Sequence, residues 1–107
     1  MKALHENLEE LINTSPILIL QFGDDACGPC HAIRFKLEKW LEGKNISARY
    51  VDIEKSLELC SQMGIFSAPT VIVYMDGQVT ARGSGYFSLD EMLGRVERYI
   101  EMGEIRA

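Results

Sequence analysis

The sequence predicts an α/β domain in which a mixed β-sheet lies between layers of helices. Short apolar runs alternate along the chain with stretches in which apolar side chains recur at helical spacing, a pattern typical of βαβ units. In the second half of the chain, the pair Asp76-Gly77 joins the apolar run at residues 71–75 to residues 78–82 and predicts an antiparallel hairpin. A helical crossover makes the strands that it joins parallel, so the sheet is expected to combine parallel and antiparallel pairs.

The first half of the chain predicts helix, strand, helix and strand in that order. Residues 3–13 carry Leu and Ile at helical spacing opposite several glutamates. Residues 17–22 are nearly all apolar, which suits a short central strand covered on both faces. Residues 30–41 place apolar side chains on one helical face and end before Gly43, a typical C-terminal stop. Residues 46–53 alternate in polarity and predict a strand.

The second half predicts a short helix, two strands and a final helix. The short helix covers about residues 55–63 and stops at a glycine, and the hairpin strands cover residues 71–75 and 78–82. The segment Ser88-Leu89-Asp90-Glu91 is a capping box that predicts the start of an amphipathic helix. No repeat, linker or low-complexity segment interrupts the pattern, so residues 1–107 are expected to form a single domain.

The composition argues against nucleic acid or membrane as a partner. The net charge is −5 and the 11 basic residues are scattered, whereas nucleic acids and anionic membranes attract clustered Lys and Arg. No apolar run approaches the length of a membrane span, and the N-terminal segment is too acidic for a secretory signal. Three cysteines, an odd number, do not suit a framework of structural disulfides. We therefore expect a cytoplasmic protein, where a cysteine pair is catalytic or binds metal.

A cysteine pair, Cys27-Gly28-Pro29-Cys30, lies between the strand at residues 17–22 and the helix that follows. A C-x-x-C motif in this setting is typical of thiol–disulfide exchange. Because Cys27 stands where a helix begins, unpaired backbone N–H groups and the helix dipole favour its thiolate. Cys27 is therefore expected to attack a substrate disulfide, and Cys30 to resolve the mixed disulfide. A structural or metal-binding role of the pair is the alternative.

The chain resembles the thioredoxin family over essentially its whole length. The features that carry the resemblance are the cysteine motif, Ala68-Pro69-Thr70 before the hairpin, Asp76-Gly77 at its turn, and Gly85 soon after it. The resemblance implies the thioredoxin fold, a three-layer α/β/α sandwich, with a cis peptide bond before Pro69 and that proline against the dithiol. About two residues precede the first expected helix, so the family's N-terminal edge strand is expected to be absent or vestigial and the mixed sheet to have four strands.

The resemblance also implies a function and a set of site residues. The function is that of a protein-disulfide reductase and electron carrier, which takes electrons from a thioredoxin-reductase-type flavoprotein and passes them to oxidised proteins. The protein is expected to be a monomer that binds no cofactor and no metal. The expected catalytic residues are Cys27 and Cys30, and the expected substrate-binding residues are Ala26, Gly28, Pro29, Ala68, Pro69 and Gly85. The main alternative is a binding module of the same fold whose dithiol is incidental or regulatory; the Gly-Pro dipeptide disfavours a thiol oxidant or isomerase.

Four positions depart from the usual pattern of the family, which has Trp, Asp, Lys and Lys where this chain has Ala26, Gln21, Tyr50 and His31, respectively. In the family the Asp is buried beneath the dithiol, where a carboxylate can accept the proton that the second cysteine loses. The amide of Gln21 does not titrate. We therefore expect water, Asp24 or Asp25 to accept this proton, with slower exchange near neutral pH. Alternatively, Gln21 is simply a polar residue with satisfied hydrogen bonds beneath the sheet.

Two further features leave alternatives open. Residues 27–31 match the C-x-x-C-H pattern of c-type haem attachment, but that interpretation requires export, and a proline lies inside the motif. Cys60 is expected to be a small buried thiol, the alternatives being a regulatory disulfide or a zinc site with Cys27, Cys30 and a histidine. His31 is expected to face solvent near the helix start.

Overall fold

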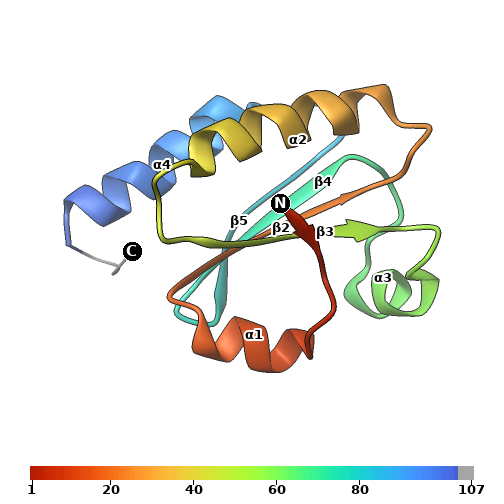
Figure 1. The fold of residues 1–107 in the computed structure, drawn as a ribbon, viewed down its shortest axis with the longest axis horizontal. Coiled ribbons are helices and arrows are strands. Elements are labelled where there is room, and N and C mark those ends of the chain that lie inside the picture. The colour runs from red at the N-terminus through yellow and green to blue at the C-terminus, as the bar shows by residue number, and fades with distance from the viewer. Residues whose placement is uncertain (104–107) are drawn as a thin grey trace.

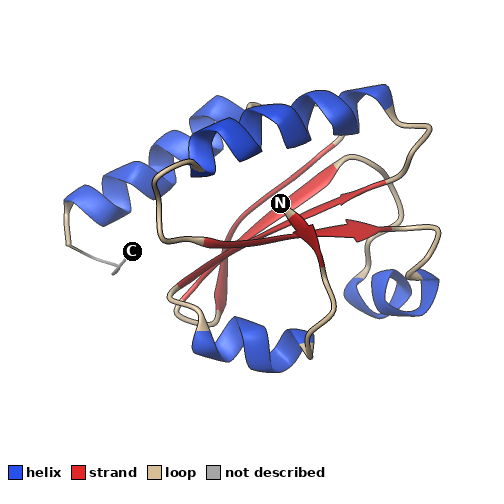
Figure 2. Ribbon diagram, in the orientation of Figure 1, coloured by secondary structure: helices blue, strands red, loops and turns tan. Residues whose placement is uncertain are grey.

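The computed structural model describes residues 1–103 and shows one sheet of five strands covered by helices on both faces (Figure 1). The strands are β1 (Lys2–Ala3), β2 (Ile17–Gly23), β3 (Ser47–Asp52), β4 (Thr70–Met75) and β5 (Gln78–Ser84). The helices are α1 (Leu8–Thr14), α2 (Gly28–Leu41), α3 (Leu57–Met63) and α4 (Leu89–Glu101). Figure 2 shows α2 and α4 on one face of the sheet and α1 and α3 on the other. The expected three-layer α/β/α sandwich of the thioredoxin fold is therefore confirmed.

The sheet is mixed, as expected, with the strand order β1-β3-β2-β4-β5. Strands β1 and β2 both run parallel to β3, whereas β4 runs antiparallel to β2 and to β5. Helix α2 is the crossover between the parallel strands β2 and β3, and Asp76 and Gly77 form the turn between β4 and β5. Both turn residues have positive φ, 49° and 82°, which is the geometry that an Asp-Gly pair supplies in a two-residue hairpin.

The N-terminal segment differs from the expectation in two respects. The sheet has five strands rather than four, because the two-residue edge strand β1 pairs with β3. This short strand is the vestigial edge strand that the resemblance allowed. Helix α1 begins at Leu8 rather than at residue 3, because the side chain of Asn7 caps it by accepting the backbone N–H of Glu10. Leu4, whose spacing fitted a longer helix, packs against the core from the segment between β1 and α1.

The core lies on both faces of the sheet, because successive side chains of a strand point to opposite faces. Strand β2 is buried along its whole length, which explains its nearly continuous apolar sequence. The cluster toward α2 and α4 includes Ile17, Ile19, Leu37, Val71, Val73, Leu93 and Val96, and the cluster toward α1 and α3 includes Leu18, Leu20, Phe22, Val51, Cys60 and Ile65. The two clusters hold β2 between them, so the loop from β2 to α2 leaves the sheet from a rigid strand end.

The helix ends follow the signals in the sequence. Helix α3 ends at Gly64, whose φ of 72° few other residues adopt without strain. Helix α4 begins after Ser88, whose Oγ accepts the backbone N–H of Glu91 over 3.1 Å, as the capping box predicted. Among the helices within residues 1–103, none combines the length and the apolar composition needed to cross a bilayer.

Candidate active site

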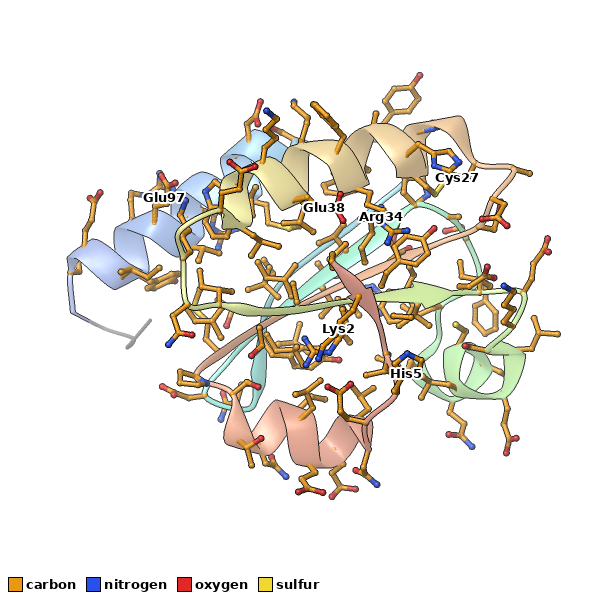
Figure 3. The ribbon with its side chains drawn as sticks, in the orientation of Figure 1. Lys2, His5, Cys27, Arg34, Glu38 and Glu97 are labelled. Carbon is orange, nitrogen blue, oxygen red and sulfur yellow. A yellow bond between two sulfur atoms is a disulfide. The ribbon has the colours of Figure 1, made fainter. Side chains whose placement is uncertain are left out.

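The two cysteines of the C-x-x-C motif form a disulfide at the start of α2 (Figure 3). Their Sγ atoms are 2.15 Å apart and their Cα atoms 5.3 Å apart. Cys27 is the N-cap residue of α2, and Cys30 lies in the first turn. The preceding loop is braced by Asp24, whose side chain accepts the N–H of Ala26 over 2.9 Å and whose carbonyl accepts the N–H of Cys27 over 3.2 Å. The disulfide therefore sits at a fixed junction between the central strand and the crossover helix.

The two sulfur-bearing residues differ in exposure. Cys27 is partly exposed, whereas Cys30 is buried, with 1% of its surface accessible. The backbone N–H of Cys30 points at the Cys27 sulfur, which accepts it over 3.2 Å. The N-terminal N–H groups and the helix dipole stabilise negative charge at this position. The site thus presents one accessible sulfur in an environment that suits a thiolate, with a second sulfur shielded behind it.

A cis peptide bond joins Ala68 to Pro69, as the resemblance implied. The carbonyl of Pro69 accepts the backbone N–H of Gly85 over 2.9 Å, which ties this turn to the end of β5. Thr70 adds a brace, because its hydroxyl donates to the carbonyl of Ser67 over 2.8 Å. The pairing of β4 with its neighbours begins at Thr70, so Ala68 lies beyond the paired part of the strand.

The structure brings four of the six expected substrate-binding residues together. Pro29, Ala68, Pro69 and Gly85 line one groove of about 540 Å³ beside the disulfide. Ala26 and Gly28 flank Cys27 and are exposed, but they do not line this groove. The groove therefore runs from the α2 side of the disulfide toward the loop after β5.

Two aromatic residues of the groove were not predicted from the sequence. Tyr86 and Phe87 line it directly after Gly85, and the side chain of Tyr86 is fully exposed. The ring of Phe87 packs against Gly83, where an added Cβ would lie 2.5 Å from two ring carbons. The sequence feature that could have predicted them is their position directly after Gly85, which the resemblance places among the substrate-binding residues. The groove thus has aromatic side chains in its lining, although Ala26 stands where the family usually has Trp.

Gln21 lies beneath the dithiol and is completely buried. Its Nε2 donates to the carbonyl of Cys30 over 2.8 Å, whereas its Oε1 has no hydrogen-bond partner among the residues that the structure describes. The interpretation of Gln21 as a satisfied polar residue is therefore correct for the amide nitrogen only. Of the two acids considered as proton acceptors, Asp24 is partly exposed and Asp25 is exposed.

Tyr50, one of the departures from the family pattern, lies close to the disulfide. Tyr50 on β3 is the direct neighbour of Gln21 on β2. Burial raises the pKa of the Tyr50 hydroxyl, with Arg34 acting in the opposite direction. At neutral pH this hydroxyl is therefore protonated and able to donate a hydrogen bond.

The third cysteine lies away from the dithiol. Cys60 is buried in the cluster on the α3 side of the sheet, as expected, and burial raises the pKa of its thiol. In the part of the chain that the structure describes, no three His, Cys, Asp or Glu side chains gather closely enough to hold a metal ion. His31 is exposed, as expected, and its Nε2 lies 3.1 Å from the carbonyl oxygen of Asp25.

The fold and the site together define a class of protein. A three-layer α/β/α sandwich with a disulfide at the junction of the central strand and a helix, and a cis-proline turn that shares a groove with Pro29 of the cysteine motif, is the architecture of a thiol–disulfide oxidoreductase. Comparison with known proteins identifies the family. The family model described as Thioredoxin matches residues 1–98, and the chain belongs to that family.

Individual relatives agree with this assignment. A thioredoxin of Coprinus comatus is 33% identical over 94 residues, which cover 82% of this chain and 80% of that protein. A thioredoxin of Mycoplasmoides gallisepticum is 28% identical over 86 residues, which cover 79% of this chain and 86% of that protein. Among solved structures, thioredoxin 1 of Thermosipho africanus is 26% identical, with a TM-score of 0.74, over 81% of this chain and 98% of that one. The chain is thus a protein-disulfide oxidoreductase whose chemistry is dithiol–disulfide exchange.

Proposed function

We propose that Cys27 is the attacking residue and Cys30 the resolving residue of a protein-disulfide reductase. The observation that carries this assignment is the difference in exposure within one bonded pair: Cys27 is accessible at the helix N-cap, and Cys30 is buried. In the first exchange the Cys27 thiolate attacks a substrate disulfide, and one substrate sulfur leaves as a thiolate. In the second, Cys30 attacks Cys27 and releases the reduced substrate, which leaves the Cys27–Cys30 disulfide.

The proposed substrate surface consists of Ala26, Gly28, Pro29, Ala68, Pro69 and Gly85. Ala26 and Gly28 leave the Cys27 side of the surface low, because neither carries a bulky side chain. Ala68 lies beyond the last paired residue of β4, so its backbone is placed to pair with an extended substrate segment as an added strand. The neighbouring groove, with Tyr86 and Phe87, accepts apolar side chains of that segment.

The exchange chemistry also indicates an electron donor and a cellular compartment for this protein. The oxidised dithiol needs an electron donor, for which we propose a thioredoxin-reductase-type flavoprotein, and the chain itself holds no cofactor or metal in this scheme. A reducing compartment such as the cytoplasm suits a dithiol that must be returned to its reduced form. Residues 1–107 act as one domain and as a monomer, and the net charge of −5 disfavours nucleic acid as a partner.

Two measurements test the proposal. The wild-type protein should accelerate the reduction of insulin disulfides by dithiothreitol, which is followed as turbidity, because each turnover regenerates the dithiol. The Cys30→Ser variant should trap a covalent adduct with a disulfide substrate, because the mixed disulfide at Cys27 then has no resolving thiol. Cys60→Ser serves as the matched control, since that thiol is buried on the other side of the sheet, and should retain full activity.

Either of two results would contradict the proposal. Equally efficient trapping through Cys30 in a Cys27→Ser variant would reverse the assignment of the two cysteines. No acceleration of insulin reduction over dithiothreitol alone would favour a binding module with an incidental dithiol.

A further inference from the structure

Gly23, at the end of β2, leaves room for two groups that come from distant parts of the sequence. A Cβ added to this glycine would lie 2.5 Å from the Tyr50 hydroxyl and 2.9 Å from the Cys30 sulfur. The hydroxyl and the sulfur thus both lie against the same side of Gly23, no farther apart than those two distances combined. The φ angle of Gly23 is not positive, so the backbone conformation does not require glycine here. The lack of room for a side chain does.

Strand register places Tyr50 under the first turn of α2. Tyr50 on β3 is paired with Gln21 on β2, and Gln21 reaches the carbonyl of Cys30. On its other side, Tyr50 is paired with Ala3 of β1, and its backbone carbonyl accepts the N–H of Leu4 over 3.0 Å. The residues directly opposite Tyr50, Gln21 and Ala3, are uncharged, so no carboxylate stands at the Gln21 position to act on Cys30. The nearest carboxylate in the sheet is that of Asp52, two residues along β3 and opposite Gly23.

Arg34 of α2 holds the tyrosine ring from above. Its guanidinium carbon lies 4.5 Å from the centre of the Tyr50 ring, and its Nη2 donates to the carbonyl of Met1 over 2.9 Å. Figure 3 shows the labelled Arg34 on α2, above the sheet and close to the N-terminal strand. A stacked guanidinium at this distance restricts the ring. Contacts on β1, β2 and α2 thus fix the backbone and the ring of Tyr50.

We infer that Tyr50 is a catalytic hydrogen-bond donor, whose hydroxyl donates to the Cys30 sulfur when that sulfur becomes a thiolate during resolution of the mixed disulfide. The inference deepens the proposed function and rests on it. Hydrogen bonds to charged groups are stronger than those between neutral groups, so a neutral donor beside a buried sulfur favours its anion. Tyr50 supplies this donor where the chain has no titrating side chain at Gln21.

The step balances without any further reactant. The S–H bond of Cys30 breaks and its proton passes to water. The Cys30 thiolate then forms a bond to the Cys27 sulfur while the bond between Cys27 and the substrate sulfur breaks. The substrate leaves with the electron pair as a thiolate, which takes up a proton. Tyr50 keeps its own proton throughout and acts only by stabilising the thiolate.

A two-phase assay separates the roles of the two cysteines. Reduced protein is mixed with dithiobis-nitrobenzoate, which releases one coloured thionitrobenzoate when Cys27 attacks and a second when Cys30 resolves the adduct. Tyr50→Phe removes only the hydroxyl, and Tyr74→Phe on β4 is the matched control, because Tyr74 is buried in the cluster on the opposite face of the sheet. The first phase reports Cys27, and the second reports the step assigned to Tyr50.

The expected change is confined to the second phase. Loss of one hydrogen bond to a charged sulfur lowers the thiolate fraction about tenfold, which raises the pH midpoint of the second phase by about one unit. The more basic sulfur is also a better nucleophile, which restores about half of the loss on a logarithmic scale, so the second phase at neutral pH slows about threefold. The charged groups that act on Tyr50 are Arg34, Asp52, Asp25 and Asp24, and Tyr50→Phe leaves all of them in place.

The outcomes separate this inference from the proposed function. An unchanged rate and pH midpoint of the second phase in Tyr50→Phe, with a normal first phase, overturns the role of Tyr50 and leaves the exchange itself intact. Absence of the first phase in the wild-type protein overturns the proposed function. If Tyr50→Phe does not fold, the reduced wild-type protein decides the matter by nuclear magnetic resonance. The chemical shift of the ring carbon that bears the Tyr50 hydroxyl should then change as Cys30 ionises, whereas that of the same carbon in Tyr74 should not. Equal changes at the two tyrosines would overturn the inference.

Discussion

A methyl group at position 23 tests the packing between the sheet and the dithiol directly. In Gly23→Ala the new Cβ would lie 2.5 Å from the Tyr50 hydroxyl, 2.9 Å from the Cys30 Sγ and 3.0 Å from the Cys30 Cβ. Such distances are well inside ordinary van der Waals contact, so the neighbours or the backbone must move. Overpacking of this kind costs about 1–3 kcal/mol. We therefore expect a loss of about 2 kcal/mol in the free energy of unfolding, a large part of the stability of a small domain.

The assay is urea unfolding of the oxidised protein at neutral pH, with the midpoint and slope measured for each variant. Gly28→Ala is the matched control, because an added Cβ there meets no atom within 4 Å, so no loss from overpacking is expected. A double-mutant cycle then identifies the atom responsible. In a Tyr50→Phe background the nearest atom is absent, so the loss caused by Gly23→Ala should shrink by about 0.5–1 kcal/mol. Full stability of Gly23→Ala, or an equal loss in both backgrounds, would refute the packing described at this strand end.

Two further predictions concern parts of the fold outside the site. A hydrogen bond from Arg49 lowers the pKa of the exposed Glu6 carboxyl from 4.5 to about 2. Because the folded-state pKa is the lower one, the pair adds stability above about pH 4.5 that is lost as the pH falls toward 2. As the pH is lowered, the urea midpoint of Glu6→Gln should therefore fall less steeply than that of the wild type. The same dependence of the midpoint on pH in both proteins would count against the pair. Leu37 is completely buried on the inner face of α2, so Leu37→Ala should cost about 2–5 kcal/mol in the same assay. Phe35→Ala, at a site 62% exposed on the same helix, should cost less than about 1 kcal/mol, and equal losses would contradict the assigned helix face.

Local sequence signals sufficed for most of the secondary structure. The capping box at Ser88, the Asp76-Gly77 turn and the C-terminal glycine at position 64 each act through neighbouring residues, and each lies where it was expected. The N-terminal segment shows the limit of such signals. Leu4 fits a helical repeat, yet the residues before it form β1, because hydrogen bonds to β3 are available only once that distant strand is in place.

The same limit applies to the site. The Cys27–Cys30 motif and the turn at Pro69 are short patterns, and the structure places the disulfide and the cis peptide bond where they were expected. The position of Tyr86 and Phe87 in the groove required the loop after β5 to meet the turn before β4. No local pattern predicts such a meeting, because it depends on how two chain segments pack against each other.

Residue types and their spacing were thus enough to establish a dithiol at a helix start, a mixed sheet between helices and the chemistry of disulfide exchange. They did not reveal that the Tyr50 hydroxyl and the Cys30 sulfur lie against the same side of Gly23. That arrangement depends on the register of β3 beside β2, and a slip of one residue would turn Tyr50 to the other face of the sheet. Register is set by the burial of all strands at once, so it becomes known only when the whole core is assembled.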